Sequence, residues 1–369
     1  MTPIHVLELA GCTPKPLSQY LKALGILRLV TEQADPKARG WWQDERFWLA
    51  TTFDAQGLGS FFLERYEPSP ILAPWNGGSG LFRNWDEKSG KFRESVACNV
   101  VEAFRSSSGN RFTPIRDALA TIDTVTARIA VAIDVSVVPK SDRKDLLILD
   151  AKGAALAIDK DSGKDRLICQ LLGLSGSFGD VIRSMVIGLP EDDRDWSPLW
   201  GRGGTDGKMD FPNVHLRRLL EIFDAAGNPR ANTREMLNNS LDGRPIPVGS
   251  LLPESVVKEK ERSIGLFEPF SAGGSNMGAG FSGGTDHNPW DFVLMMEGAV
   301  GFRSAAARRL ESQGRHPGAA AASPFAMRVL GAGASSIDSS DEQGSKFGKF
   351  EQWMPIWARP ATQGEVGAL

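Results

Sequence analysis

The chain has few cysteines, with only Cys12, Cys98 and Cys169 among its 369 residues. Their number is odd and they lie far apart, which argues against a disulfide framework and against a zinc site made of paired cysteines. This usage fits a reducing compartment, so we expect a cytoplasmic protein. The sequence also lacks an apolar run of the roughly 18 residues that cross a bilayer, and its start lacks a basic segment followed by a long apolar core. We therefore expect a soluble protein with no membrane partner.

The chain lacks a net positive charge, because 45 Asp and Glu residues outnumber 42 Lys and Arg residues and give a net charge of −3. Global basicity therefore does not indicate nucleic-acid binding, and any such site must be a local patch. The composition does not indicate disorder, since 41% of the residues are hydrophobic and can bury a substantial core. Two domains and one elaborated domain are both consistent with this length.

Signals for catalysis are sparse. Asp286, His287 and Asp291 are residue types that bind metals, but they straddle a predicted helix cap and first turn, where capping explains them better. The other histidines stand apart from any ordered set of carboxylates: His5, His215 and His316. No serine or cysteine lies in a sequence that resembles a nucleophile elbow. We therefore predict a non-catalytic protein, with no metal site and no cofactor.

The stretch ILAPWNGGSGLF, from Ile71 to Phe82, is a glycine-rich loop suited to close contact with another molecule. It offers a flat ring, a two-sided amide, permissive backbone and a hydroxyl in Trp75, Asn76, Gly77, Gly78 and Ser79. A phosphate-binding loop would continue with Lys and Ser or Thr in fixed register, whereas here the first basic residue is Arg83. The alternative is a tight glycine turn with Trp75 buried in a core.

Basic residues follow this loop closely. Between Arg83 and Lys144 there are 11 Lys and Arg residues against 8 Asp and Glu residues, an excess of three. Four of the basic residues flank Trp85 and Phe92: Arg83, Lys88, Lys91 and Arg93. Basic residues interleaved with aromatic ones suit a nucleic-acid backbone with a base or sugar stacked nearby. The alternative is a solvated, charged hairpin.

Two later stretches are also rich in glycine. LWGRGGTDGKMDF, from Leu199 to Phe211, can offer backbone N–H groups and the cations of Arg202 and Lys208 to an anion. SAGGSNMGAGFSGGT, from Ser271 to Thr285, contains Ser275 and Asn276, which rival Asn76 as groups that could read a base. Simple turn chemistry accounts for the first stretch nearly as well, and the second stretch is either a flexible surface loop or one that orders against a ligand.

Hydrophobic periodicity predicts an α+β protein with irregular, glycine-rich loops. The main predicted elements are strands Ile4–Leu9, Arg39–Phe53 and Leu146–Leu149, and helices Pro16–Gln33, Val96–Phe104, Thr113–Val131 and Val214–Ala226. Asn288 as a cap and Pro289 at the first helical position start a long buried helix, with apolar residues up to Ala306 and a basic end. We divide the chain into an N-terminal portion (1–145), a middle portion (146–265) and a C-terminal portion (266–369).

Six phrases together resemble the large subunit of the type I-G (formerly I-U) CRISPR interference complex. They are GCTPKPLSQYLKALGILRLVTEQ, ARGWW, PILAPWNGGSGLF, GRGGTDGKMDF, NPWDFVLMMEGAVGF and WMPIWARPAT, and they extend along essentially the whole chain. Members of that family are commonly much longer. The chain therefore resembles their N-terminal portion, without the mostly helical C-terminal region.

The resemblance implies a non-catalytic binding protein. Such subunits contact the 5′ end of the guide RNA, read the short protospacer-adjacent motif in double-stranded target DNA and help to open the duplex for guide pairing. The implied partners are guide RNA, target DNA, the backbone and guide-end subunits, and transiently a helicase-nuclease. On this basis we assign DNA contacts to Trp75, Asn76, Gly77, Gly78, Ser79, Arg83, Lys88, Lys91, Arg93, Arg202, Lys208, Ser275 and Asn276, as our own hypothesis.

Two other interpretations stay open. A structural scaffold subunit would bind protein and guide RNA without reading DNA. A phosphate-handling enzyme would use the glycine loops, and it would require a base and a metal ligand that the sequence does not reveal.

Overall fold

The computed structural model describes most of the chain between residues 3 and 367. The described residues are 3–76, 78–83, 85–86, 88–93, 95–143, 145–151, 154–188, 194–200, 211–244, 267–268, 287–303, 305–308, 319–322, 326–327, 351–352 and 354–367. Helices and small antiparallel sheets alternate along them, which confirms the predicted α+β class. No helix among these residues is both long enough and apolar enough to span a membrane.

The helices vary from one turn to five. They are α1 (Leu17–Gln33), α2 (Ala55–Ser60), α3 (Val96–Arg105), α4 (Thr113–Ile129), α5 (Lys140–Arg143), α6 (Ser162–Leu172), α7 (Gly176–Met185), α8 (Phe211–Ile222), α9 (Thr233–Asp242), α12 (Pro289–Ala299) and α13 (Gln363–Val366). The further helical turns are of the π or 3-10 type: η1 (Phe61–Arg65, π), η2 (Asn110–Phe112, 3-10) and η3 (Pro198–Trp200, 3-10).

The strands are short. They are β1 (His5–Leu9), β2 (Arg39–Gln43), β3 (Arg46–Thr51), β4 (Trp85–Asp86), β5 (Lys91–Phe92), β6 (Val131–Ile133), β7 (Leu146–Ala151), β8 (Ala154–Asp159), β9 (Val186–Gly188), β10 (Arg194–Trp196), β11 (Ala305–Arg308), β12 (Ala319–Ala322), β13 (Ala326–Met327) and β14 (Glu351–Gln352).

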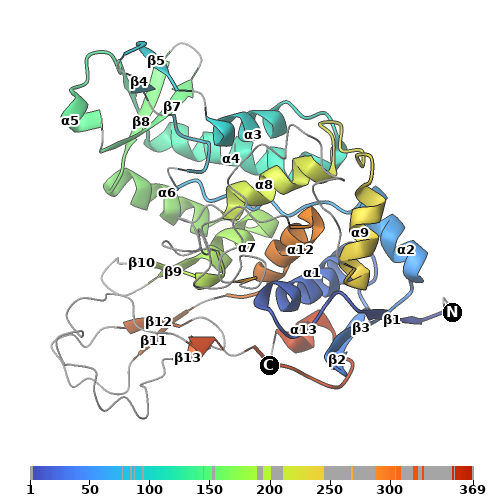
Figure 1. Cartoon of the computed structure of the whole chain (residues 1–369). Coiled ribbons are helices and arrows are strands. Elements are labelled where there is room, and N and C mark those ends of the chain that lie inside the picture. The colour runs from blue at the N-terminus through green and yellow to red at the C-terminus, as the bar shows by residue number, and fades with distance from the viewer. Residues whose placement is uncertain are drawn as a thin grey trace, which may run out of the picture.

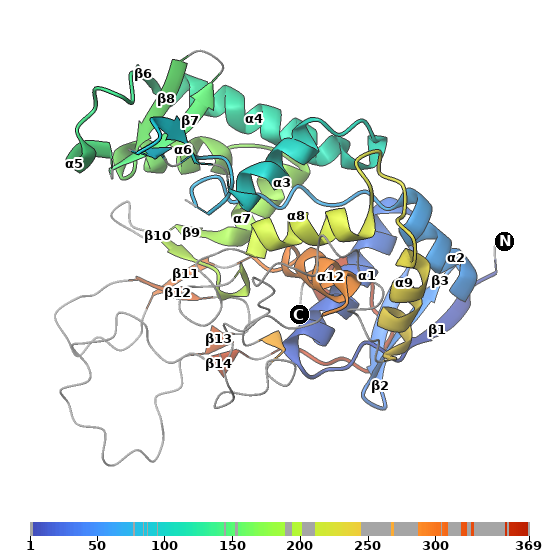
Figure 2. The same ribbon diagram turned by 45° about the horizontal axis from the view of Figure 1, so that its top comes forward.

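A pair of apolar helices, α1 and α12, forms the centre of the molecule, and α8 covers the other side of α12 (Figures 1 and 2). Asn288 caps α12 by accepting a hydrogen bond from the Trp290 amide, and Pro289 follows at the first helical position, as the sequence predicts. Two glycines bring the helices together. A Cβ on Gly25 would lie 2.0 Å from the Leu294 carbonyl oxygen, and one on Gly298 would lie 1.9 Å from the Leu21 carbonyl oxygen.

The N-terminal sheet packs its inner face on α1, where Tyr20 and Trp42 stack with ring centroids 5.4 Å apart. Its strand order is β1-β3-β2, and all neighbours are antiparallel. The prediction of one strand over Arg39–Phe53 is wrong, because the chain reverses at Asp44 and Glu45, which have φ of 50° and 57°. Such left-handed values at two successive residues are typical of a tight hairpin turn.

A lobe projects at the upper left of Figure 1 and consists of the β4–β5 hairpin lying on the three-stranded sheet β6-β8-β7. One face of that sheet belongs to the main core through Leu147 and Ile158. The other face carries a separate small core with three buried residues: Val135, Ile148 and Ala157. The lobe is therefore attached to the main part of the molecule, which we call the body, through one layer of side chains.

Several predicted helix boundaries differ from the structure: the helix predicted over Thr113–Val131 ends at Ile129, and the one predicted over Val214–Ala226 begins at Phe211 and ends at Ile222. The long helix predicted after Pro289 ends at Ala299, and Ala305–Arg308 form strand β11. Gly298 and Gly301 explain the early stop, because glycine weakens a helix interior. The predicted division at residue 145 falls within the lobe, whose sheet joins strands from both sides of it. One hydrophobic core contains residues from all three predicted portions.

Candidate nucleic-acid interface

The approach to the glycine loop is held inside the body. Ile71, Leu72 and Ala73 are buried, and Trp75 is 2% exposed. The Trp75 ring stacks on Trp196 at 5.3 Å with an interplanar angle of 16°. In this conformation the ring fills a core, as the alternative interpretation has it, and offers no face to a base or sugar. Trp75 therefore anchors the loop.

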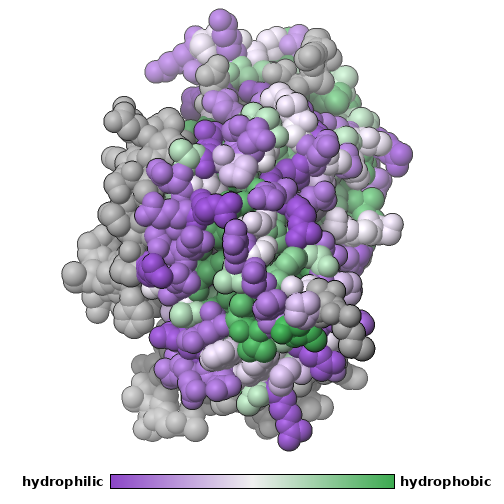
Figure 3. Space-filling view, turned by 90° about the vertical axis from the view of Figure 1, so that its right-hand side faces the viewer, coloured by the Kyte–Doolittle hydropathy of each residue, from purple (hydrophilic) through white to green (hydrophobic). Residues whose placement is uncertain are grey.

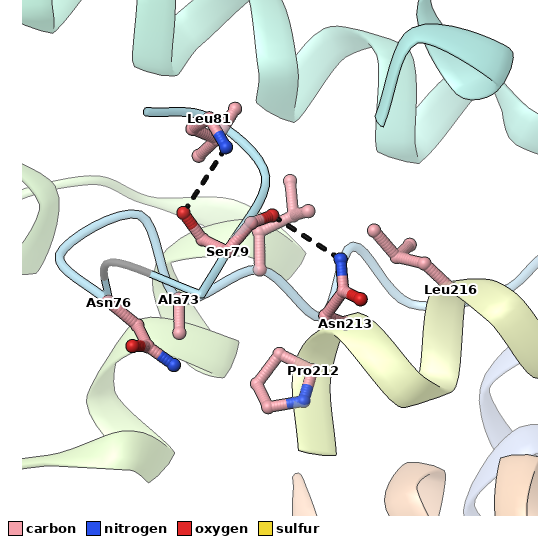
Figure 4. A pocket seen from close by; sticks show the side chains of 8 residues that line it. Ala73, Asn76, Ser79, Leu81, Pro212, Asn213 and Leu216 are labelled. Carbon is pink, nitrogen blue, oxygen red and sulfur yellow. Dashed lines mark hydrogen bonds between the residues drawn. The ribbon is translucent and has the colours of Figure 1, made fainter. Parts of the chain in front are cut away.

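The turn after Trp75 is held by local hydrogen bonds. The Asn76 side-chain oxygen accepts from the Gly78 amide at 3.1 Å, and the Ser79 amide donates to the Asn76 carbonyl at 3.0 Å. The Ser79 hydroxyl accepts from the Leu81 amide at 3.3 Å, and the Ser79 carbonyl accepts from the Asn213 side chain at 3.4 Å (Figure 4). Ser79 is buried, so its hydroxyl serves the turn.

Beside this turn is a small hollow lined by residues of the loop and of α8 (Figure 4). Its volume is about 10 Å³, which is room for about one water molecule. It is too small to hold a nucleotide. What the loop presents outward is its tip, where Asn76 is half-buried and Gly78 is exposed.

Gly80 fixes the exit from the loop. Its φ is +80°, and an added Cβ would lie 2.1 Å from the carbonyl oxygen of Ala97 in α3. Only glycine fits this backbone and this close approach. The loop is therefore clamped at Trp75 on one side of its tip and at Gly80 on the other.

The β4–β5 hairpin carries the predicted basic residues. Lys88, Lys91 and Arg93 are exposed, while Trp85 and Phe92 meet edge to face at 5.1 Å and pack on the small core of the lobe. Arg93 lies 3.8 Å from Asp86. The aromatic rings therefore face into the lobe, and the cations face outward. Their interleaving in the sequence reflects strand alternation.

Arg83 connects the loop to this hairpin. Its amide donates to the carbonyl of Ile148 in β7 at 2.7 Å, which ties the chain to the edge of the lobe sheet. Its side chain is half-buried. Five predicted contact residues lie outside the described residues: Gly77, Arg202, Lys208, Ser275 and Asn276.

A buried polar cluster between α1 and α12 is absent from the sequence predictions. The fully buried Glu297 carboxylate pairs with Arg28 and accepts from the Tyr66 hydroxyl at 2.6 Å and the Ser69 amide at 2.8 Å. Burial, together with the Glu297 charge, raises the pKa of Tyr66. The available signal was the presence of charged residues inside two apolar helices, Arg28 in α1 and Glu297 in α12.

His215 of α8 lies near this cluster and is fully buried. Neither ring nitrogen has a hydrogen-bond partner among the described residues. Burial lowers the pKa of His215 to about 4, against a smaller opposing effect of Glu297. The ring is therefore neutral at physiological pH and behaves as a core residue.

A second polar group fixes the start of α12. Lys22 donates to Asp291 and to the Ser240 carbonyl, both at 2.8 Å, and the Ser240 hydroxyl donates to Asp291 at 2.5 Å. Burial raises the pKa of nearby Cys12 to about 12, so its thiol stays protonated and inert. Asp291 is thus engaged in an ion pair. Among the described residues, no three His, Cys, Asp or Glu side chains are placed to hold a metal.

The sequence matches no family model and no curated protein.

Proposed function

We propose that this chain is the non-catalytic large subunit of a CRISPR RNA-guided DNA surveillance complex, and that it reads the motif flanking the target in duplex DNA. One observation carries the proposal. A clamped turn with an exposed tip is joined, through Arg83 and β7, to a hairpin with three exposed cations. Such a pairing of a narrow, rigid tip with outward positive charge suits the groove and backbone of a duplex.

The two parts divide the work. Lys88, Lys91 and Arg93 hold phosphates, which supplies affinity and orientation without sequence information. The tip at Asn76 and Gly78 enters the groove and presents to the base edges the Asn76 side-chain amide, whose oxygen also accepts from the Gly78 amide. Trp75 acts from inside the body by fixing the turn. Guide pairing reads the rest of the target, so the protein needs to read only the flank.

The phrases behind the family resemblance also meet in space. The Trp42 amide of ARGWW donates to the Trp357 carbonyl of WMPIWARPAT at 2.9 Å. Lys22 of the first phrase pairs with Asp291 of NPWDFVLMMEGAVGF. Residues far apart in the sequence thus contact one another, as expected for a shared core. These contacts support the proposal through the fold alone.

A scaffold subunit that does not read DNA is the second candidate. The burial of Trp75 favours this candidate, because a side chain that inserts between base pairs of DNA would have to lie outside the core. In that case the exposed tip would brace a neighbouring subunit. The two candidates differ in one respect: only the first gives the complex a sequence preference at the target flank.

The test is duplex binding by the reconstituted guide-RNA complex over a library randomised at the bases flanking the target. Replacing Lys88, Lys91 and Arg93 together by Ala should weaken binding at least tenfold for every flank and reduce the slope of log K against log salt by up to about 3. Asn76→Ala should reduce the flank preference while the salt slope stays unchanged.

The matched control removes three exposed cations from the body: Lys37, Arg128 and Arg244. Like Arg93, Arg244 lies close to an Asp, so general loss of charge is accounted for. Equal effects of both triple variants would exclude the hairpin from DNA binding. A complex that keeps the same flank preference without this protein would favour the scaffold.

A further inference from the structure

Among the described residues, the outer edge of the N-terminal sheet is uncovered. β1 lies at one end of the order β1-β3-β2, and no other described strand pairs with its outer side. In Figures 1 and 2 it forms the right-hand margin of the described fold. An uncovered strand edge offers unpaired backbone groups to another strand, and proteins usually protect such edges with charge, proline or a covering segment.

Bond alternation shows which backbone groups are open. The amides of Gly40 and Trp42 in β2 donate away from β3, to Ala361 and Trp357. The other residues of β2 therefore bond to β3, where their partners are residues 46, 48 and 50. The remaining residues of β3, at 47, 49 and 51, bond to β1 on the other side. Residue 49 of β3 lies opposite residue 7 of β1. The N–H and C=O groups of residues 6 and 8 therefore point to the outer edge.

This edge is apolar. Ile4 is 73% exposed and Val6 is 54% exposed, two of the six large hydrophobic side chains exposed among the described residues. Figure 3 looks at this side and shows a hydrophobic area at the height of β1, bordered by hydrophilic residues. On the same face of the sheet the half-buried Trp41 and Trp48 stack at 6.3 Å. Glu8, the one Asp, Glu, Lys or Arg residue on β1, lies 3.9 Å from Arg46.

The opposite edge of the same sheet is already covered by an extended segment. Gly40 and Ala361 exchange backbone hydrogen bonds of 2.8 and 3.0 Å, and the Trp357 indole donates to the Gly40 carbonyl at 2.7 Å. Here the chain's own residues 354–361 supply backbone bonds together with a large apolar side chain. The sheet thus accepts an extended, apolar segment at one edge, and β1 presents the same chemistry at the other.

We propose that β1 binds an extended, predominantly apolar segment of a partner protein as an additional strand. Charge complementarity favours such a segment over nucleic acid, because the exposed surface of β1 carries no net positive charge that would attract phosphates. The partner's backbone pairs with residues 6 and 8, and its alternate side chains cover Ile4 and Val6. The identification of the partner as another subunit of the guide-RNA complex rests on the proposed function.

The test is Val6→Pro in the full chain, added to a guide-RNA complex assembled without this subunit. Proline removes the outward N–H of residue 6 and obstructs an incoming strand, yet it is tolerated on a strand edge that faces solvent. We expect the variant to join at least tenfold more weakly than wild type, with an unchanged melting temperature. Amide exchange at Val6 and Glu8 should be fast in the free wild-type chain and slow after joining.

Val6→Asp is the second variant, in case proline disturbs the sheet, and Val137→Asp is its matched control. Val137 is 74% exposed and follows β6, a strand of the lobe, so it lies away from β1 (Figure 2). Normal joining by both Val6 variants would overturn this proposal alone, whereas failure of the wild-type chain to join would overturn the proposed function as well. Self-association of the wild-type chain that Val6→Pro abolishes would instead identify a second copy as the occupant and overturn the proposal. Binding of single-stranded RNA by β1 would also overturn the proposal.

Discussion

The body and the lobe hold their side chains by different means. The body buries many large rings and several charged groups, including Lys22, Arg28 and Glu297. The outer layer of the lobe rests on three buried side chains and keeps its cations in solvent. Buried charges require fixed partners, whereas exposed cations are free to adapt to a ligand. The comparison indicates a rigid body and a lobe whose exposed side chains are less constrained.

The stability of the two regions should therefore respond very differently to substitution. A change in the body centre has no room to relax, because backbone meets backbone there. A change in the small core of the lobe affects few neighbours, so its effect stays local. The following predictions test this contrast, from the largest expected effect to the smallest.

Gly298→Ala should have the largest effect. The new methyl group would lie 1.9 Å from the Leu21 carbonyl oxygen and would push α1 and α12 apart. We expect a loss of about 4–5 kcal/mol in the free energy of unfolding, measured by denaturant titration. Gly59→Ala in α2 is the control, because its Cβ would meet nothing within 4 Å. The control should stabilise the protein by about 0.5–1 kcal/mol, and equal effects would refute the close crossing.

Glu297→Gln should cost somewhat less. The amide keeps the shape of the carboxylate but leaves the buried Arg28 charge with the exposed Glu32 as its remaining counter-ion, for a loss of about 3–4 kcal/mol. Replacing both partners, as Arg28→Met with Glu297→Gln, should cost less than Glu297→Gln alone, because no buried charge has then lost its buried partner and an oxygen remains to accept from Tyr66 and Ser69. A double-mutant cycle by thermal unfolding measures this, and additive effects would contradict direct pairing.

The buried His215 should give the body a pH dependence. Burial lowers its pKa from 6.5 to about 4, so between these values the unfolded chain binds a proton that the folded chain does not. The contribution of the neutral His215 ring to the free energy of unfolding is therefore complete above pH 6.5, and the free energy of unfolding falls by about 3 kcal/mol as the pH drops to 4. His215→Phe removes the titrating group and should flatten this part of the curve. An unchanged slope would show that other groups produce it.

Sequence reasoning worked where the structure is local. The periodicity of the first helix and the Asn288–Pro289 start of α12 are both confirmed, because they depend on residues a few positions apart. The burial of Glu297 and the crossing of Gly25 with Gly298 join segments more than 200 residues apart. A glycine or a glutamate within an apolar helix signals that something is needed there, but not which partner supplies it.

The candidate interface shows the same limit. The sequence singled out the turn and the basic hairpin, and the structure joins them through Arg83 and β7. The sequence could not predict which way the Trp75 ring points, because that ring stacks on Trp196, a residue 121 positions later. Whether an aromatic residue beside a glycine loop faces a ligand or a core depends on such distant contacts.

The smallest global effect is expected in the lobe, where two adjacent residues of β7 face opposite sides. Leu147 belongs to the main core and Ile148 to the small core beneath the hairpin. Leu147→Ala should lower the global free energy of unfolding by about 2–3 kcal/mol. Ile148→Ala should change it by less than about 1 kcal/mol while speeding amide exchange in residues 85–93. Under the proposed function, Ile148→Ala should also weaken duplex binding by the complex, because the hairpin would then hold its cations less firmly. If both substitutions lower global stability equally, the lobe unfolds together with the body, and the rigid and adaptable regions are one cooperative unit.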